Sequence, residues 1–144
     1  MNFSKILIFL ITSVVILTND SCKKKDDVVP YVRVNFTIFL SDPDFVSLQT
    51  VGNSVYVTGG VSGIILYRKS QEEFSAIERC CSYQPSDRCA VLVDSANTNS
   101  LICKCCNSKF SIWDGSVLSG VASRSLTTYQ TLFDQQYNSL KVFN

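Results

Sequence analysis

The sequence predicts a single all-β domain, and three observations carry that prediction. Residues 31–40 alternate strictly, with Val34, Phe36 and Ile38 on one face and Arg33 and Asn35 on the other. Period-two alternation over this length is a strand signal. Short apolar segments then recur at the spacing typical of antiparallel strands, and no helical period follows the first 17 residues. Many short strands separated by turn residues indicate a sandwich or barrel.

The strands are expected in order along the chain between clusters of turn-forming residues. Asp42-Pro43-Asp44, Gly59-Gly60, Gln71-Glu72-Glu73 and Asn97-Thr98-Asn99 mark four of the turns. The predicted strands cover residues 31–40, 54–58, 64–68, 74–79, 90–93, 101–103, 110–113, 126–131 and 140–143.

The first 21 residues have the order of a signal peptide. Lys5 precedes an apolar core, Ile6 to Leu17, which is too short to remain in a bilayer as a spanning helix. Ser21-Cys22 follows and resembles a bacterial lipoprotein processing site, although Asn19 and Asp20 depart from its usual pattern. We therefore predict a signal peptide over residues 1–21 and a lipid anchor on Cys22. The alternatives are an ordinary cleaved signal, or a Cys22 that pairs with another cysteine.

Residues 22–30 are predicted to be a lipidated tether, because Lys23 to Asp27 contains no apolar residue and cannot fold alone. The expected location is the membrane, at the periplasmic face or the cell surface. Residues 31–144 are long enough for one domain. The net charge of +1 gives no electrostatic argument for a nucleic-acid partner. With no histidine in the chain, a Ser-His nucleophile pair is excluded, and nothing suggests a hydrolase. An enzyme is the weakest of the function classes considered.

Cysteines mark the candidate site. Six of the seven lie between Cys80 and Cys106, in two groups that each follow an apolar segment, and we expect each group at the tip of a hairpin. An exported compartment favours disulfides, and six thiols allow fifteen pairings. Four thiolates could instead bind zinc, one iron or a two-iron cluster. Free thiols are the third alternative. The predicted metal ligands are Cys81, Cys89, Cys103 and Cys106, with Cys80 or Cys105 as possible substitutes.

Ser108 and Phe110 follow the second cysteine group, and Gly115, Gly120, Ala122, Leu126 and Tyr129 come after them. Together with both cysteine groups, this segment from about residue 80 to 129 resembles the Rieske iron-sulfur domain. That family has a C-x-H loop, a second loop of the form C-P-C-H-G-S-x-F, and a G-P-A-x-x-x-L-x-x-Y tail. The matching segments here are Cys81-Ser82-Tyr83, then Cys103 to Phe110, then a tail formed by Gly120, Ala122, Leu126 and Tyr129. Tyr83 and Cys106 stand where the family has its two histidines, so histidine ligation of a cluster is excluded by composition.

The resemblance implies a Rieske-like antiparallel sandwich or barrel with a small two-loop cluster-binding subdomain. It further implies a protein that holds a 2Fe–2S cluster, or another metal such as zinc, through cysteines and passes electrons to a redox or surface partner. The competing prediction is a cluster-free binding or structural lipoprotein stabilised by disulfides. Phe110 and Trp113 are expected in the core beneath the second loop, with Tyr129 packed over them and Tyr83 packed on the neighbouring loop.

Overall fold

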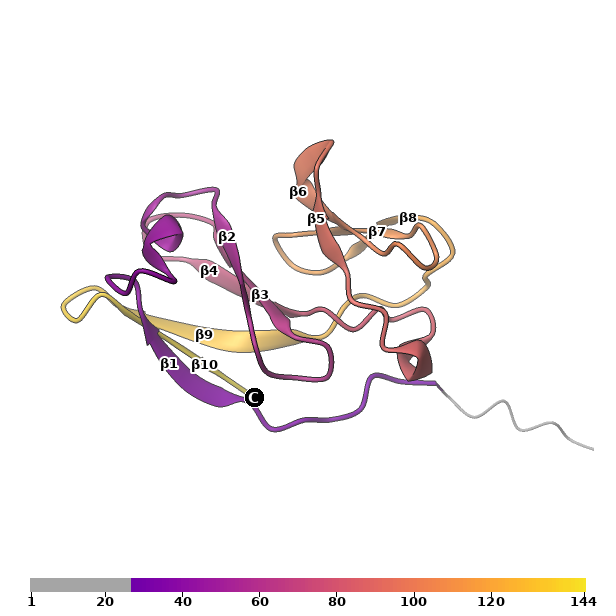
Figure 1. Cartoon of the computed structure of the whole chain (residues 1–144), viewed down its shortest axis with the longest axis horizontal. Coiled ribbons are helices and arrows are strands. Elements are labelled where there is room, and N and C mark those ends of the chain that lie inside the picture. Colours follow the sequence, from indigo (N-terminus) through magenta and orange to yellow (C-terminus); the bar gives the residue numbers. More distant parts are fainter. Residues whose placement is uncertain (1–26) are drawn as a thin grey trace, which may run out of the picture.

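The computed structural model describes residues 27–144, which form ten strands in two antiparallel sheets (Figure 1). The predicted signal peptide and Cys22 lie outside this range. The large sheet has the order β1-β10-β9-β4-β3-β2 and the small sheet the order β5-β6-β7-β8. The strands are β1 (Asn35–Phe39), β2 (Ser54–Val57), β3 (Ile64–Arg68), β4 (Phe74–Glu78), β5 (Leu92–Asp94), β6 (Asn97–Ile102), β7 (Lys109–Ser111), β8 (Val117–Ser119), β9 (Thr128–Asp134) and β10 (Ser139–Phe143). Two short 3-10 helices, η1 (Val46–Gln49) and η2 (Pro85–Asp87), complete the described chain.

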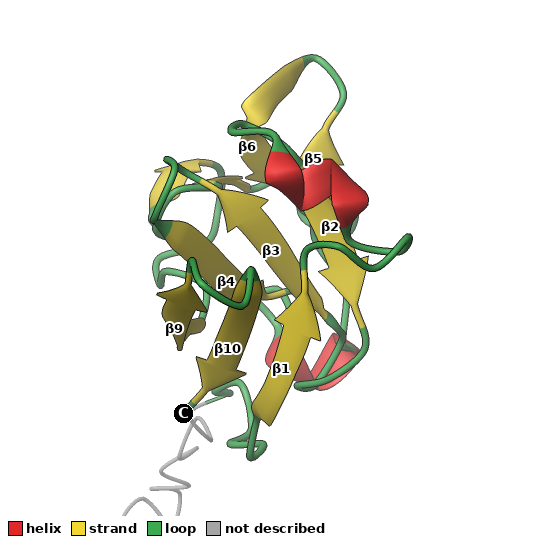
Figure 2. Cartoon of the chain, turned by 90° about the vertical axis from the view of Figure 1, so that its left-hand side faces the viewer, coloured by secondary structure: helices red, strands yellow, loops and turns green. Residues whose placement is uncertain are grey.

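The large sheet curls around its own apolar core (Figure 2). Alternation in β1 points Phe36 and Ile38 toward this core, as the sequence pattern predicts, and Leu48 of η1 packs against it. Removing these side chains from water is the main stabilising contribution. The buried members are Val34, Ile38, Leu40, Leu48, Ile64, Leu66, Phe74, Ala76, Tyr129, Leu140 and Val142.

A second core lies between the outer face of β3 and β4 and the small sheet. Ile65 and Ile77 point to this side, and Leu101, Phe110 and Ile112 meet them from the small subdomain. All five residues of β3 and all five of β4 are buried, because these two strands are covered on both faces. The first cysteine loop therefore begins directly after one of these two fully buried strands, β4.

The small subdomain is inserted between two neighbouring strands of the large sheet. The chain leaves β4 after Glu78, forms the small sheet and both cysteine loops, and returns as β9 at Thr128. There β9 pairs with β4 through two residue pairs only, Ala76 with Tyr129 and Ile77 with Thr128. The amide of Glu78 also donates to the carbonyl of Thr127, 2.8 Å away. Departure and return points are thus direct neighbours.

A buried carboxylate fixes this junction. Glu78 is fully buried and accepts hydrogen bonds from the amides of Val61, Ser62 and Cys80, at 2.8, 2.9 and 2.9 Å, and from the hydroxyl of Tyr129 at 2.7 Å. Four donors offset the cost of burying the carboxylate. A side chain at Gly60 (φ +61°) would collide with this carboxylate, so glycine is required there. The bond to the Cys80 amide holds the start of the first cysteine loop.

The all-β prediction is confirmed, and so is the small subdomain that carries two cysteine loops. Among the strands and turns, one predicted turn is wrong and one strand was not predicted. Asn97 and Asn99 were expected in a turn but belong to β6, while the turn falls at Ser95 and Ala96. The Asp94 carboxylate caps that turn by accepting from the amide of Ala96 at 3.0 Å, which supplies the bonding expected of the asparagines. Strand β8 was not predicted, because its three residues have little apolar alternation.

Candidate metal centre

The second cysteine loop is the tip of the β6–β7 hairpin, as predicted. It is closed by the amide of Cys103, which donates to Ser108 O at 2.9 Å, and by the amide of Asn107, which donates to Cys103 O at 2.8 Å. Asn107 has a φ of +56°, a left-handed conformation that asparagine adopts more easily than most residues. This turn directs Cys103 inward and leaves Cys106 half-buried.

The first loop is not the hairpin tip that the sequence suggested. It crosses from β4 of the large sheet to β5 of the small sheet, with a single bridge between Cys80 and Ala90 and with η2 between them. The crossing is stabilised by the amide of Cys81, which donates to the carbonyl of Cys89 at 2.8 Å. Cys81 therefore faces the second loop, while Cys80 lies apart, with its Sγ 3.6 Å from the carbonyl of Pro85.

The loops bring three free thiols together. The sulfur atoms of Cys81, Cys103 and Cys106 all lie within 4.8 Å of one another, and those of Cys81 and Cys106 are 3.6 Å apart. Thiolates 2.3 Å from one tetrahedral ion would be separated by about 3.8 Å. Cys81 and Cys103 are almost fully buried. The three sulfurs therefore have the spacing and the shielding of a thiolate metal site.

Cys89, the fourth predicted ligand, has a different partner. It forms a disulfide with Cys105, the one disulfide within residues 27–144, and its sulfur lies 3.7 Å from the Cys103 sulfur. The structure thus brings three of the four predicted ligands together as free thiols and places the fourth in a covalent bond beside them. These cysteines line a small hollow together with Tyr83, Gln84 and Asp87. The side chain of Tyr83 is 43% exposed.

The three thiols differ in their electrostatic surroundings. Burial raises the pKa of Cys81 well above its ordinary value, and burial also raises the pKa of Cys80. Burial acts in the same direction on Cys106, but hydrogen bonds from the hydroxyl and amide of Ser108 and contacts with Cys103 and Cys81 outweigh it, so the pKa of Cys106 is lowered. Cys106 is therefore more easily converted to a thiolate than Cys81 or Cys80.

Ser108 is oriented for this role by its own partners. Its fully buried hydroxyl oxygen accepts from the amides of Val121 and Ala122, at 3.1 and 3.0 Å, and lies 3.3 Å from the Cys106 sulfur. With both lone pairs occupied, the hydroxyl proton is left to point toward that sulfur. Gly120 makes the arrangement possible, because a Cβ there would lie 2.5 Å from the Ser108 Cα.

Replacing Ser108 with alanine is expected to raise the pKa of Cys106, because the thiolate loses its hydroxyl donor. At neutral pH less thiolate is then present, and the rate of Cys106 alkylation in native, metal-free protein should fall severalfold, because the thiolate is the reactive form. The rate against pH, read by mass spectrometry of the Cys106 peptide, measures the shift. Ser116→Ala is the matched control, because the hydroxyl of Ser116 donates to Asp114 and not to a cysteine. An unchanged pH profile would contradict the role assigned to Ser108.

The aromatic residues near the second loop were only partly predicted. Phe110 is fully buried beneath it, as expected, but Trp113 is 48% exposed and lies edge-on to Tyr67, with ring centroids 5.9 Å apart. Tyr129 belongs to the core of the large sheet instead of covering Phe110, because its hydroxyl binds Glu78. Sequence spacing gave no signal for Glu78, since a buried glutamate is rare and its donors come from distant segments.

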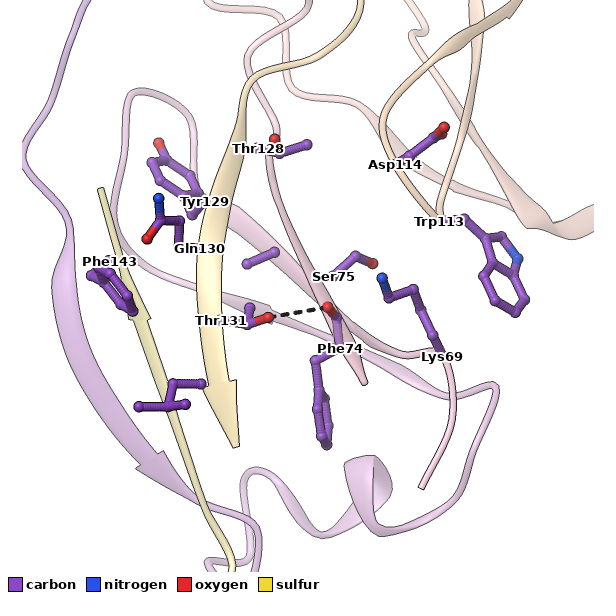
Figure 3. Close-up of a pocket in the computed structure, with 12 residues that line it drawn as sticks. Lys69, Phe74, Ser75, Trp113, Asp114, Thr128, Tyr129, Gln130, Thr131 and Phe143 are labelled. Carbon is purple, nitrogen blue, oxygen red and sulfur yellow. Dashed lines mark hydrogen bonds between the residues drawn. The ribbon is translucent and has the colours of Figure 1, made fainter. Parts of the chain in front are cut away.

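A second, open hollow lies between Trp113 and strand β9 (Figure 3). It exists because β4 and β9 diverge after two pairs. The hydroxyl of Thr131 donates to the carbonyl of Phe74 at 3.2 Å in place of a backbone bond (Figure 3). Lys69 and Asp114 are its charged lining residues. Neither group of closely spaced metal-ligating side chains found within residues 27–144 lies in this hollow. Both groups consist of cysteines from the two loops.

Fold and site together define an all-β domain with a buried cluster of thiols held by two loops of a small subdomain. No family model matches the chain, and no protein of curated function matches it. Among solved structures, the chain is similar to a crystal structure from Mycobacterium tuberculosis, provisionally assigned as the small subunit of an NADH-dependent nitrite reductase. The identity is 17%, the TM-score is 0.47, and the match covers 79% of this chain and 97% of that one. The function must therefore be argued from the site itself.

Proposed function

We propose that the protein binds a soft metal through Cys81, Cys103 and Cys106 and acts as an electron-transfer protein. The observation that carries the proposal is the convergence of these thiols within 4.8 Å from two separate loops. Thiolate ligands select soft or borderline metals such as iron, zinc and copper(I). A bound iron would supply the redox chemistry, whereas zinc would make the site structural.

The spacing favours a single metal over a 2Fe–2S cluster. Ligands on the two irons of a cluster are separated by the cluster as well as by their own bonds, so they stand further apart than ligands on one ion. Here all three thiols are within 4.8 Å of one another, and Cys89, needed as a fourth sulfur, is held by Cys105. Tyr83 and Asp87 line the same hollow as the three thiols and would be the side chains beside a bound ion. The chain itself supplies shielding through Cys81 and Cys103, and stabilises negative charge on Cys106 through Ser108.

Metal and labile sulfide content of protein purified without oxygen test this proposal. One iron per chain without sulfide is the expected result for an electron-transfer site. Two irons with two sulfides would show that the loops open to accept a cluster. Stoichiometric zinc would retain the metal site and contradict electron transfer. Protein without metal, which also fails to bind added iron, zinc or copper(I), would contradict the proposal as a whole.

We further propose that a lipid on Cys22 holds the protein at a membrane. The described chain begins beside the first cysteine loop, where the Asp27 carboxylate accepts from the amide and the hydroxyl of Ser86 in η2, at 3.2 and 2.9 Å (Figure 1). Five residue steps from Cys22 to Asp27 span at most about 18 Å. This geometry supports a thiol site held close to the membrane surface, and hence a redox partner in or at that membrane. No helix within residues 27–144 is long and apolar enough to cross a bilayer.

Replacing Cys22 with alanine is therefore expected to move the exported protein from the detergent phase to the aqueous phase. The acyl chains supply the membrane affinity, and a domain without them has no other anchor in the proposal. Detergent phase partitioning followed by immunoblotting measures the change. Cys80→Ser, which leaves the anchor in place, is the control. If the Cys22 variant stays in the membrane fraction after signal removal, the lipid anchor is contradicted.

A further inference from the structure

A free thiol touches the disulfide. The Cys103 sulfur lies 3.7 Å from that of Cys89, and the sulfurs of Cys89, Cys103 and Cys105 are all within 4.8 Å of one another. A thiolate in contact with a disulfide sulfur is the starting arrangement for exchange. Cys103 belongs to this group and also to the group of three free thiols, Cys81, Cys103 and Cys106. Metal binding by the free thiols does not explain why Cys103 also contacts the disulfide.

The different burial of the three cysteines favours one direction of thiol–disulfide exchange. Cys103 is fully buried and Cys89 is half-buried, whereas Cys105 is exposed at the tip of the second loop. Attack on Cys89 would leave the new disulfide inside and release Cys105 to solvent. A released sulfur that faces water is hydrated and free to react further, whereas a buried one is neither.

We propose that Cys103 and the Cys89–Cys105 disulfide form an intramolecular thiol–disulfide exchange pair. The Cys103 thiol gives its proton to solvent, and its sulfur electron pair forms a bond to Cys89. The Cys89–Cys105 bond breaks, its electron pair leaves on the Cys105 sulfur, and that thiolate takes a proton from solvent. One thiol and one disulfide are present before and after the step, so no oxidant or reductant is consumed.

In the structure, the Cys103 sulfur is not yet aligned for attack on Cys89. Because the three sulfurs form a compact triangle, they are not arranged in the line that displacement requires, and the second loop must shift for attack. A metal on Cys81, Cys103 and Cys106 would occupy the attacking sulfur and hold that loop. The exchange itself does not depend on the metal, but its suppression by metal rests on the proposed function.

Native alkylation of the full chain tests the exchange. Chelator-treated protein is incubated with iodoacetamide over hours, then digested without reductant and mapped by mass spectrometry. We expect alkylated Cys105 to accumulate in the same molecules that contain a Cys89–Cys103 disulfide. If no Cys89–Cys103 disulfide forms, the inference is overturned, whatever the variants show.

Two variants sharpen the result. Cys103→Ser should lower the rate of Cys105 alkylation by at least about tenfold, since the attacking sulfur is gone. Cys80→Ser, a buried cysteine outside both sulfur groups, should leave the rate unchanged. Equal alkylation of Cys105 with and without Cys103 would overturn the proposal.

Repeating the alkylation with added zinc tests the exchange and the proposed metal site independently of each other. Zinc added before iodoacetamide should slow alkylation of Cys105 in the natural chain and should not do so in Cys81→Ser, which keeps the exchange pair but loses one metal ligand. Exchange that zinc does not slow would contradict the metal site while leaving the exchange itself established.

Discussion

Replacing Cys81 with serine is expected to weaken metal binding by more than about a hundredfold, beyond the loss typical of changes outside the ligand shell. The substitution removes one of three sulfurs and replaces it with a poor ligand for soft metals. Because metal binding free energy at such a site is also folding free energy, the variant should lose the stabilisation that added metal gives the natural chain. Competition with a coloured chelator measures affinity, and thermal unfolding with and without metal measures the stabilisation.

Cys80→Ser is the matched control for this prediction. Its thiol is adjacent in sequence and also buried, yet it lies against Pro85 and outside the group of three sulfurs. Cys106→Ser should behave like Cys81→Ser. If Cys80→Ser reduces metal binding as strongly as Cys81→Ser does, the ligand assignment is wrong.

Replacing Glu78 with alanine is expected to lower the free energy of unfolding by about 3–5 kcal/mol, as for other broken networks of buried polar groups. The change leaves the amides of Val61, Ser62 and Cys80 and the hydroxyl of Tyr129 without their acceptor. Each unsatisfied buried donor costs about 1–3 kcal/mol unless water reaches it. Urea unfolding followed by tryptophan fluorescence measures the loss, with Trp113 as the only tryptophan in the chain.

Two further variants identify the cause of that loss. Glu78→Gln keeps the shape and one oxygen acceptor, so we expect a smaller loss than for alanine. Glu73→Ala removes an exposed glutamate near β4 and should change stability by less than about 0.5 kcal/mol. A Glu78→Ala protein as stable as the Glu73→Ala protein would rule out the carboxylate as the fixed point of the junction.

The sequence predicted the strands well where alternation or turn residues carried a local signal. β1, β3 and β4 follow from apolar patterning and flanking turns, and the predicted 64–68 strand has the bounds of β3. Patterning could not distinguish the Asn97 segment from a turn. Asn97 pairs with Asp94 across the two-residue turn, and the carbonyl of Asn99 accepts from the amide of Ile112, a residue distant in sequence, at 3.2 Å. Local propensity gives way to tertiary context in such segments.

For the candidate site, the sequence predicted that three of the cysteines come close together, but it did not predict the disulfide bond of the fourth. Sequence spacing placed Cys81, Cys103 and Cys106 on facing loops, and the structure brings them together. The sequence could not assign the disulfide partner of Cys89, because connectivity among several cysteines depends on three-dimensional proximity. Nor could it foresee that the first loop crosses between sheets, which separates Cys80 from the other thiols.

The neighbouring departure and return points of the small subdomain have a consequence for protein engineering. Since Glu78 and Thr127 are hydrogen-bonded neighbours, residues 79–127 form a cassette whose two ends meet at one place on the host sheet. The host needs only a short link across that gap to keep β4 beside β9, and insertions with adjacent ends are the kind that domains accept most readily. Ligand sets could therefore be exchanged by replacing the cassette as a whole, while the core of the large sheet stays as it is.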